Sequence, residues 1–253
     1  SGFPPPPFPL LSLSSSRLIT HASALSSYES EPESFRNAIR NQYAATCDLI
    51  DRLTRGNLKE SEMDFLTPRS MRFLVRLPYF FQPDRTRQLL AETCRTWMRN
   101  ADRTVADIAP DCPSYTGSLP DSPIRAFLTP NRFGKTILES HFSSFSHLKR
   151  WRCDADARLR GCQLLLAMKA YKQDHGSLPE TLDALVPHYV KQVPFDPFDG
   201  KPMRYSAEKK VTYSIGENLK DDGGSNADIN TGRATAYPYA HWNCLDIVFK
   251  ADF

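Results

Sequence analysis

The segment from Gly216 to Asn230 concentrates side chains that can hold a cation. It combines carboxylates, side-chain amides and a serine hydroxyl with glycines, which allow backbone carbonyls to turn inward. Calcium prefers about six to eight such oxygen ligands. The spacing is not that of an EF-hand, because Thr231 replaces the required glycine and Tyr237 the closing glutamate. Composition alone leaves two interpretations, a calcium site and a solvated loop, and it favours the loop.

Another acidic segment, earlier in the chain at Asp196-Pro197-Phe198-Asp199-Gly200, is interpreted as a turn rather than a metal site. Asp-Pro and Asp-Gly pairs are typical of turns, and an aspartate side chain bonds to backbone two residues further on.

Sequence motifs of known catalytic sites are absent from the chain. It has no Gly-x-Ser-x-Gly elbow, no HExxH zinc motif and no phosphate-binding loop. The histidines are dispersed rather than grouped: His21, His141, His147, His175, His188 and His241. These features favour a protein that is not an enzyme.

Six cysteines are present, and none forms a CxxC pair of the kind found in zinc and thioredoxin-type sites. Cys153 and Cys162 fall on one predicted helix, too far apart to bond to each other. Two alternatives stay open for the cysteines as a set: buried thiols, or one or two disulfides in an oxidising compartment.

The charge balance and the apolar runs limit the classes of partner. A formal net charge of +3 is too small a bias to predict nucleic-acid binding. No apolar run approaches the ~20 residues that a membrane helix needs. Because the sequence starts with Ser1-Gly2 rather than methionine, we expect an N-terminal signal or membrane anchor to precede it.

The N-terminal half is predicted to be an arm followed by helices. Residues 1–29 are rich in proline and serine, and the run Pro4–Pro7 favours an extended arm. Residues 30–134 form the predicted helical region. Its first helix starts at the capping-box spacing of Ser30-Glu31-Pro32-Glu33 and ends at Gly56, and another starts at Pro83.

The C-terminal part, residues 135–253, is predicted to be a long helix followed by a small antiparallel sheet. The helix runs from about Lys135 to His175, where Gly176 ends it. A second capping-box pattern, Ser177-Leu178-Pro179-Glu180, predicts a short helix. Residues 203–206 and 211–215 predict a hairpin, and 244–250 a third strand. The chain is therefore predicted to be an α+β protein whose sheet packs on the long helix.

A series of short motifs carries a family resemblance. In order, they are Tyr171-Lys-Gln-Asp-His-Gly-Ser-Leu-Pro179, Leu182-Asp-Ala-Leu-Val-Pro187, Val193-Pro-Phe-Asp-Pro-Phe-Asp-Gly200, Arg204-Tyr205, Tyr213-Ser-Ile-Gly216 and Asp222-Gly-Gly224. In this order and spacing the chain resembles the C-terminal domain of the major pseudopilin of type II secretion systems. It is also similar to uncharacterised bacterial envelope proteins that carry the same module. The resemblance covers roughly residues 155–250.

The resemblance implies a long helix packed on a small sheet and a calcium site in the loop after Gly216. It implies as calcium ligands the backbone carbonyl of Ile215 and the side chains of Asn218, Asp221, Asp222 and Asp228. Asn218 stands where the pseudopilin usually has aspartate. The predicted helix lies mid-chain and is amphipathic, whereas a pseudopilin starts with its apolar helix, so we infer a shared module and not a shared fibre.

These features predict a non-enzymatic bacterial envelope protein with a structural or protein-binding role. We expect it outside the cytoplasm, in the periplasm or envelope, held at the inner membrane by its N-terminal anchor and binding protein partners there. One alternative is a metal-assisted hydrolase with its site between the helical region and the module. Another is an adaptor that uses the Pro4–Pro7 run as a ligand.

Overall fold

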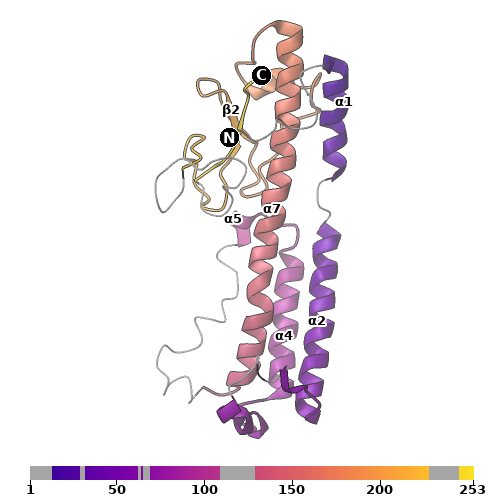
Figure 1. Ribbon diagram of the computed structural model, residues 1–253, viewed down its shortest axis with the longest axis vertical. Coiled ribbons are helices and arrows are strands. Elements are labelled where there is room, and N and C mark those ends of the chain that lie inside the picture. Colours follow the sequence, from indigo (N-terminus) through magenta and orange to yellow (C-terminus); the bar gives the residue numbers. More distant parts are fainter. Residues whose placement is uncertain (1–12, 29–31, 62–63, 65–68, 109–128, 228–244) are drawn as a thin grey trace, which may run out of the picture. The chain divides into compact units, whose positions relative to one another are not determined.

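The computed structural model describes residues 13–28, 32–61, 64, 69–108, 129–227 and 245–253. The chain divides into two compact units (Figure 1). The sheet module comprises Ser1–Ser30, Thr104–Asp107 and Arg150–Phe253, and the helical unit comprises Glu31–Arg103 and Ile108–Lys149. The long helix α7, Arg132–His175, contributes residues to both units.

The helical unit is built on α2, Pro32–Arg55, and α4, Pro83–Arg99. The two helices pack through apolar side chains, including an edge-to-face contact of Phe35 with Trp97 at 6.3 Å between ring centroids. An ion pair between Asp51 and Arg87 also joins them. A 3₁₀ helix, η3 at Arg69–Arg76, lies between them in the sequence. The predicted helices ending at Gly56 and starting at Pro83 are confirmed.

The N-terminal segment differs from the extended arm predicted for residues 1–29. Residues 1–12, which include the Pro4–Pro7 run, lie outside the described residues. The next residues form helix α1, Ser15–Leu25, and a short 3₁₀ helix, η2 at Ser26–Tyr28. Leu18 and Ala22, four residues apart on one face of α1, are fully buried, and Leu18 belongs to the core of the sheet module. This burial stabilises a helix in a serine-rich segment of modest intrinsic propensity.

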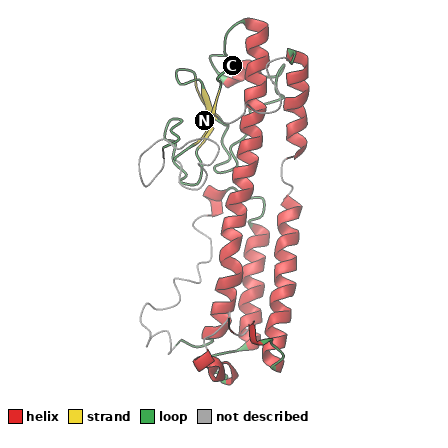
Figure 2. Ribbon diagram, viewed as in Figure 1, coloured by secondary structure: helices red, strands yellow, loops and turns green. Residues whose placement is uncertain are grey.

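The sheet module contains three short antiparallel strands: β1 at Arg204–Ser206, β2 at Val211–Ser214 and β3 at Ile247–Lys250 (Figure 2). Strand β2 is central and is buried along its whole length. Tyr213 of β2 pairs with Arg204 on one side and with Val248 on the other. The predicted hairpin, the third strand and the α+β class are confirmed, with helix predominating.

Helix α7 approaches the sheet closely where it carries a glycine. A Cβ atom at Gly161 would lie 2.3 Å from the ring of Phe249 on β3, a distance that side chains do not tolerate. Phe249, Leu164 and Met168 all belong to the core of the module. The predicted long helix is confirmed, and it begins at Arg132 and ends before Gly176, whose φ of +79° suits a helix end.

The segment after α7 is less helical than its capping-box pattern predicted. Only a 3₁₀ turn forms, η6 at Leu182–Leu185, and Thr181 precedes it without a side-chain capping bond. Leu182 and Leu185 are buried in the module core, so packing rather than the cap fixes this turn. Within the described ranges, none of the helices has the apolar length needed to cross a membrane.

Candidate functional site

The first acidic segment along the chain, residues 196–200, forms a closed turn around Asp196, which is fully buried. One carboxylate oxygen accepts hydrogen bonds from the Phe198 backbone N–H at 3.0 Å and the Ser214 hydroxyl at 2.8 Å. The other accepts from the Ile215 backbone N–H at 2.9 Å and from Arg204 at 3.1 Å. Burial raises the pKa of Asp196, and the hydrogen bonds from Phe198, Ile215 and Ser214 act against that rise. The turn interpretation is confirmed, since the chain itself satisfies this carboxylate.

Arg204 connects the two acidic segments. Its guanidinium donates to Asp196, to Asp199 at 2.6 Å and to Asp221 at 3.3 Å. Burial lowers the pKa of Arg204, but its bond to Asp199 and the charges around it outweigh that effect and raise the pKa overall. One planar donor group thereby anchors three carboxylates next to β1.

The second acidic segment follows β2 and contains the predicted calcium ligands. It brings Asn218 and Asp222 together, with the Asn218 amide nitrogen 2.7 Å from an Asp222 oxygen. Asp221 turns elsewhere, to the Tyr213 hydroxyl at 3.1 Å, the Gly223 N–H and Arg204. Ile215 is buried, and its backbone N–H donates to Asp196. Asp228 lies outside the described residues.

The pKa of Asp221 reflects this internal pairing. Its partial burial acts to raise the pKa, but the hydrogen bonds from Gly223 and Tyr213 and the nearby Arg204 outweigh burial and lower it. The same contact contributes to the high pKa of Tyr213, which burial and the bond to Asp221 raise to about 12.

Asp246, directly before β3, supports this loop and was missed by sequence reasoning. It is 1% exposed and accepts backbone N–H bonds from Gly224 at 2.9 Å, Ser225 at 3.0 Å and Asp222 at 3.4 Å. Burial raises its pKa, and the three backbone bonds act against the rise. Its only sequence signal is an acid directly before an apolar strand. By accepting these three backbone N–H groups, the carboxylate ties the loop to the start of β3.

The residues fit a calcium ion in part. Asp222 offers a carboxylate of the right kind. Asn218 lies beside it, but its amide nitrogen donates to Asp222 and its side-chain oxygen accepts from the Lys220 N–H at 3.0 Å. Asp221 does not fit, because both of its oxygens already accept hydrogen bonds within the chain. Among the residues that the structure describes, no group of three or more His, Cys, Asp or Glu side chains is arranged to hold a metal ion.

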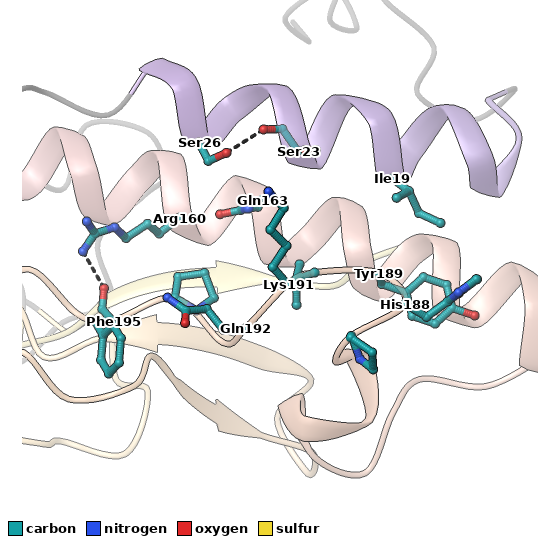
Figure 3. A pocket seen from close by; sticks show the side chains of 13 residues that line it. Ile19, Ser23, Ser26, Arg160, Gln163, His188, Tyr189, Lys191, Gln192 and Phe195 are labelled. Atoms are coloured by element: carbon teal, nitrogen blue, oxygen red, sulfur yellow. Dashed lines mark hydrogen bonds between the residues drawn. The ribbon is translucent and has the colours of Figure 1, made fainter.

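A groove in the sheet module is a feature that the sequence did not indicate. It lies between α1, α7 and the segment 187–195, and its cavity volume is about 590 Å³ (Figure 3). Ile19 and Ser23 come from α1, and Arg160 and Gln163 come from α7. This volume is within the range of about 300–1,000 Å³ that ligand sites occupy. We call it the α1–α7 groove.

Hydrogen bonds and ring contacts support the groove at one end. The Tyr189 hydroxyl donates to Asp174 at 2.9 Å, and Ser15 of α1 donates to the same carboxylate oxygen at 3.0 Å. His175 stacks on Tyr171 with ring centroids 4.1 Å apart. Burial and the Asp174 bond raise the pKa of Tyr189 to about 12, so this hydroxyl stays protonated and keeps donating. These contacts tie α1 to the end of α7.

The cysteines that the structure describes are not in disulfides: Cys47, Cys94, Cys153 and Cys162. Cys112 and Cys244 lie outside the described residues. Burial, with a smaller contribution from Cys47, raises the pKa of Cys94 to about 12. Cys94 is therefore a protonated, poorly nucleophilic core thiol at neutral pH.

Comparison of the chain with protein-family models, with curated proteins and with solved structures gave no match.

Proposed function

We propose that this protein is a non-enzymatic bacterial envelope protein whose sheet module has a structural or protein-binding role. The observation that carries the proposal is the ordered motif series from Tyr171 to Gly224, which resembles the pseudopilin module. An N-terminal anchor would hold the protein at the inner membrane, with the module outside the cytoplasm. There it would meet its protein partners.

The internal pairing of the motif residues supports a structural use of the series. Asp196 binds Arg204 and neighbouring backbone N–H groups. The Tyr205 hydroxyl donates a hydrogen bond to the Pro179 carbonyl at 3.0 Å. Tyr213 and Asp221 also bind each other. Residues engaged in this way hold the module together and are poorly placed to react with a substrate. The α1–α7 groove supplies a concave surface for a partner.

Calcium is the second part of the proposal. The loop after β2 would be stabilised by one calcium ion held by Asn218, Asp222 and the Ile215 carbonyl, with Asp228 completing the set. The adjacency of Asn218 and Asp222 supports this assignment. The bound ion would neutralise carboxylate charge and fix the loop.

Cell fractionation tests the proposed location. The full-length gene, tagged at its C-terminus, is expressed in a Gram-negative host, and spheroplasts are treated with protease before fractionation. We expect the protein in the inner-membrane fraction, with the tag digested in intact spheroplasts. A protein recovered in the cytosol and protected from protease would contradict the proposal.

A further inference from the structure

We infer that the α1–α7 groove binds an acidic peptide segment of a partner protein in an extended conformation. The inference rests on the proposed protein-binding function and adds to it the chemistry of the partner. Three features of the groove carry it: its charge, the spread of that charge along its length, and its mixture of amide and apolar side chains.

The two lining side chains that carry a formal charge at neutral pH, Arg160 and Lys191, are both positive. Arg160, His188 and Lys191 belong to the lining, and no acidic side chain is among its described residues. Arg160 donates to the Phe195 backbone carbonyl at 2.6 Å, which fixes its guanidinium beside the segment 187–195. Lys191 is exposed. A groove of one charge sign attracts a ligand of the opposite sign and disfavours basic partners.

The basic side chains are distributed along the groove rather than gathered at one point. In Figure 3, Arg160 lies near one end beside Phe195, His188 lies toward the other end, and Lys191 extends from the segment 187–195 toward α1. A compact anion would engage one of these groups. An extended chain with acidic side chains at intervals would engage both Arg160 and Lys191 and run on past the His188 ring, because side chains along an extended strand repeat at intervals of about 7 Å on one face.

The remaining lining suits a peptide backbone and its apolar side chains. Gln163 and Gln192 carry both a donor and an acceptor, which match the N–H and C=O groups of a peptide bond. The ring of Phe195 is 48% exposed at one end of the groove, and Ile19 and Val190 add apolar surface. An exposed aromatic ring in a concave site is a common anchor point for a bound partner.

An NMR titration with a defined peptide tests the inference. The probe is an acetylated and amidated hexapeptide of alternating glutamate and leucine, added to the ¹⁵N-labelled full chain. The neutral control replaces each glutamate of the probe with glutamine. We expect saturable shifts of the Ser23, Gln163, Lys191 and Gln192 amide signals with the acidic probe alone. Raising the ionic strength from about 0.05 M to about 0.5 M should weaken the binding.

A matched pair of charge reversals identifies the site. Lys191→Glu should weaken binding of the acidic probe at least about tenfold, since it places a like charge in the groove. Lys220→Glu, an exposed lysine in the acidic loop and outside the groove, should leave the affinity unchanged. Both positions are exposed, so neither change removes a core contact.

Several outcomes would overturn the inference. Equal shifts with the neutral peptide would remove the charge requirement, and an unchanged affinity in Lys191→Glu would place the site elsewhere. Sodium glutamate producing the same shifts would indicate a small-anion site, and binding to phosphatidylglycerol vesicles in place of the peptide would indicate a lipid surface. Failure of peptide binding leaves the fractionation result standing, whereas a cytosolic protein overturns the proposed function without affecting the titration.

Discussion

The two acidic segments of the sheet module look alike in composition and differ in how their carboxylates are used. Asp196 accepts four hydrogen bonds and is fully buried. Asp222, in the second segment, accepts one side-chain hydrogen bond, from Asn218, and is partly exposed. The first segment is complete without a ligand. In the second segment, the Asp222 carboxylate has lone pairs that accept no side-chain hydrogen bond, so a bound ion would stabilise this segment more than the first.

The difference between the segments comes from the position of the donors and not from the number of acids. Strand β2 places the Ser214 hydroxyl and the Ile215 N–H against Asp196, and β1 adds Arg204. Beyond β2 the chain turns through Gly216, at φ +65°, and Leu219, at φ +57°. Asp222 is therefore carried away from the strand donors, and a composition count cannot distinguish the two cases.

The largest effect is expected from Asp196→Asn. The amide nitrogen would face two donors, the Ile215 N–H and Arg204, and would leave them unsatisfied. We expect the free energy of unfolding of the sheet module to fall by about 3–5 kcal/mol. Hydrogen exchange of the β2 amides at increasing urea concentration measures this value for the module alone.

Asp222→Asn, in the absence of calcium, is the control in the other segment. It removes a carboxylate with a single side-chain hydrogen bond, so the cost should stay below about 1 kcal/mol. Equal losses for the two variants would show that the segments do not differ as described.

A smaller effect is expected from Arg204→Lys, which tests whether the guanidinium geometry matters. Lysine keeps the charge but can reach only part of the set Asp196, Asp199 and Asp221. We expect a loss of about 2 kcal/mol in the free energy of unfolding. A double-mutant cycle with Asp196→Asn should show strong coupling, and strictly additive losses would rule out the pairing.

Calcium should stabilise the second segment and leave the first unchanged. A ligand that binds only the folded state at about ten times its Kd adds about 1.4 kcal/mol, which raises the melting temperature by a few degrees. Asp222→Ala should abolish the rise, and Asp221→Asn should retain it, because Asp221 is engaged by Arg204 and Tyr213. An absence of any rise at millimolar calcium in the unmodified protein would contradict the calcium proposal.

A modest, pH-dependent effect is expected at Tyr213, which donates to Asp221. Since the pKa of Tyr213 is raised to about 12, the folded protein keeps this proton after the unfolded chain, with a pKa of about 10, has lost it. Stability should therefore fall as pH rises from about 10 to about 12, and Tyr213→Phe should reduce that slope at a cost of about 1 kcal/mol at neutral pH. Urea titrations at pH 9 and pH 11, in chelator, measure both. An unchanged slope would contradict the contact.

Local patterns in the sequence predicted most of the elements. The helical period predicted α7, the alternating residues predicted the three strands, and the left-handed glycines marked the helix ends. Helix α1 was missed because its burial depends on partners more than a hundred residues away, such as Met168 in the same core. Its serines and the preceding prolines pointed to an extended chain.

The candidate sites were harder to predict, because they depend on which distant residues meet. Asp246 closes the acidic loop from twenty or more residues away in the sequence, and no spacing rule links it to Gly224 or Ser225. The α1–α7 groove joins α1 to the segment 187–195, and neither has a binding motif. The contact between Asn218 and Asp222 is easier to anticipate, because both residues lie within one short loop.

Amide hydrogen exchange with and without calcium tests the difference between the two segments most directly. The amides of Asp222, Gly224 and Ser225 should exchange more slowly when calcium is added. The amides of Phe198 and Ile215 should keep their rates, because Asp196, to which they donate, already accepts four hydrogen bonds and gains no ligand when calcium is added. Unchanged exchange in the second segment, or equal slowing in both, would contradict the view that only one of them gains from an ion.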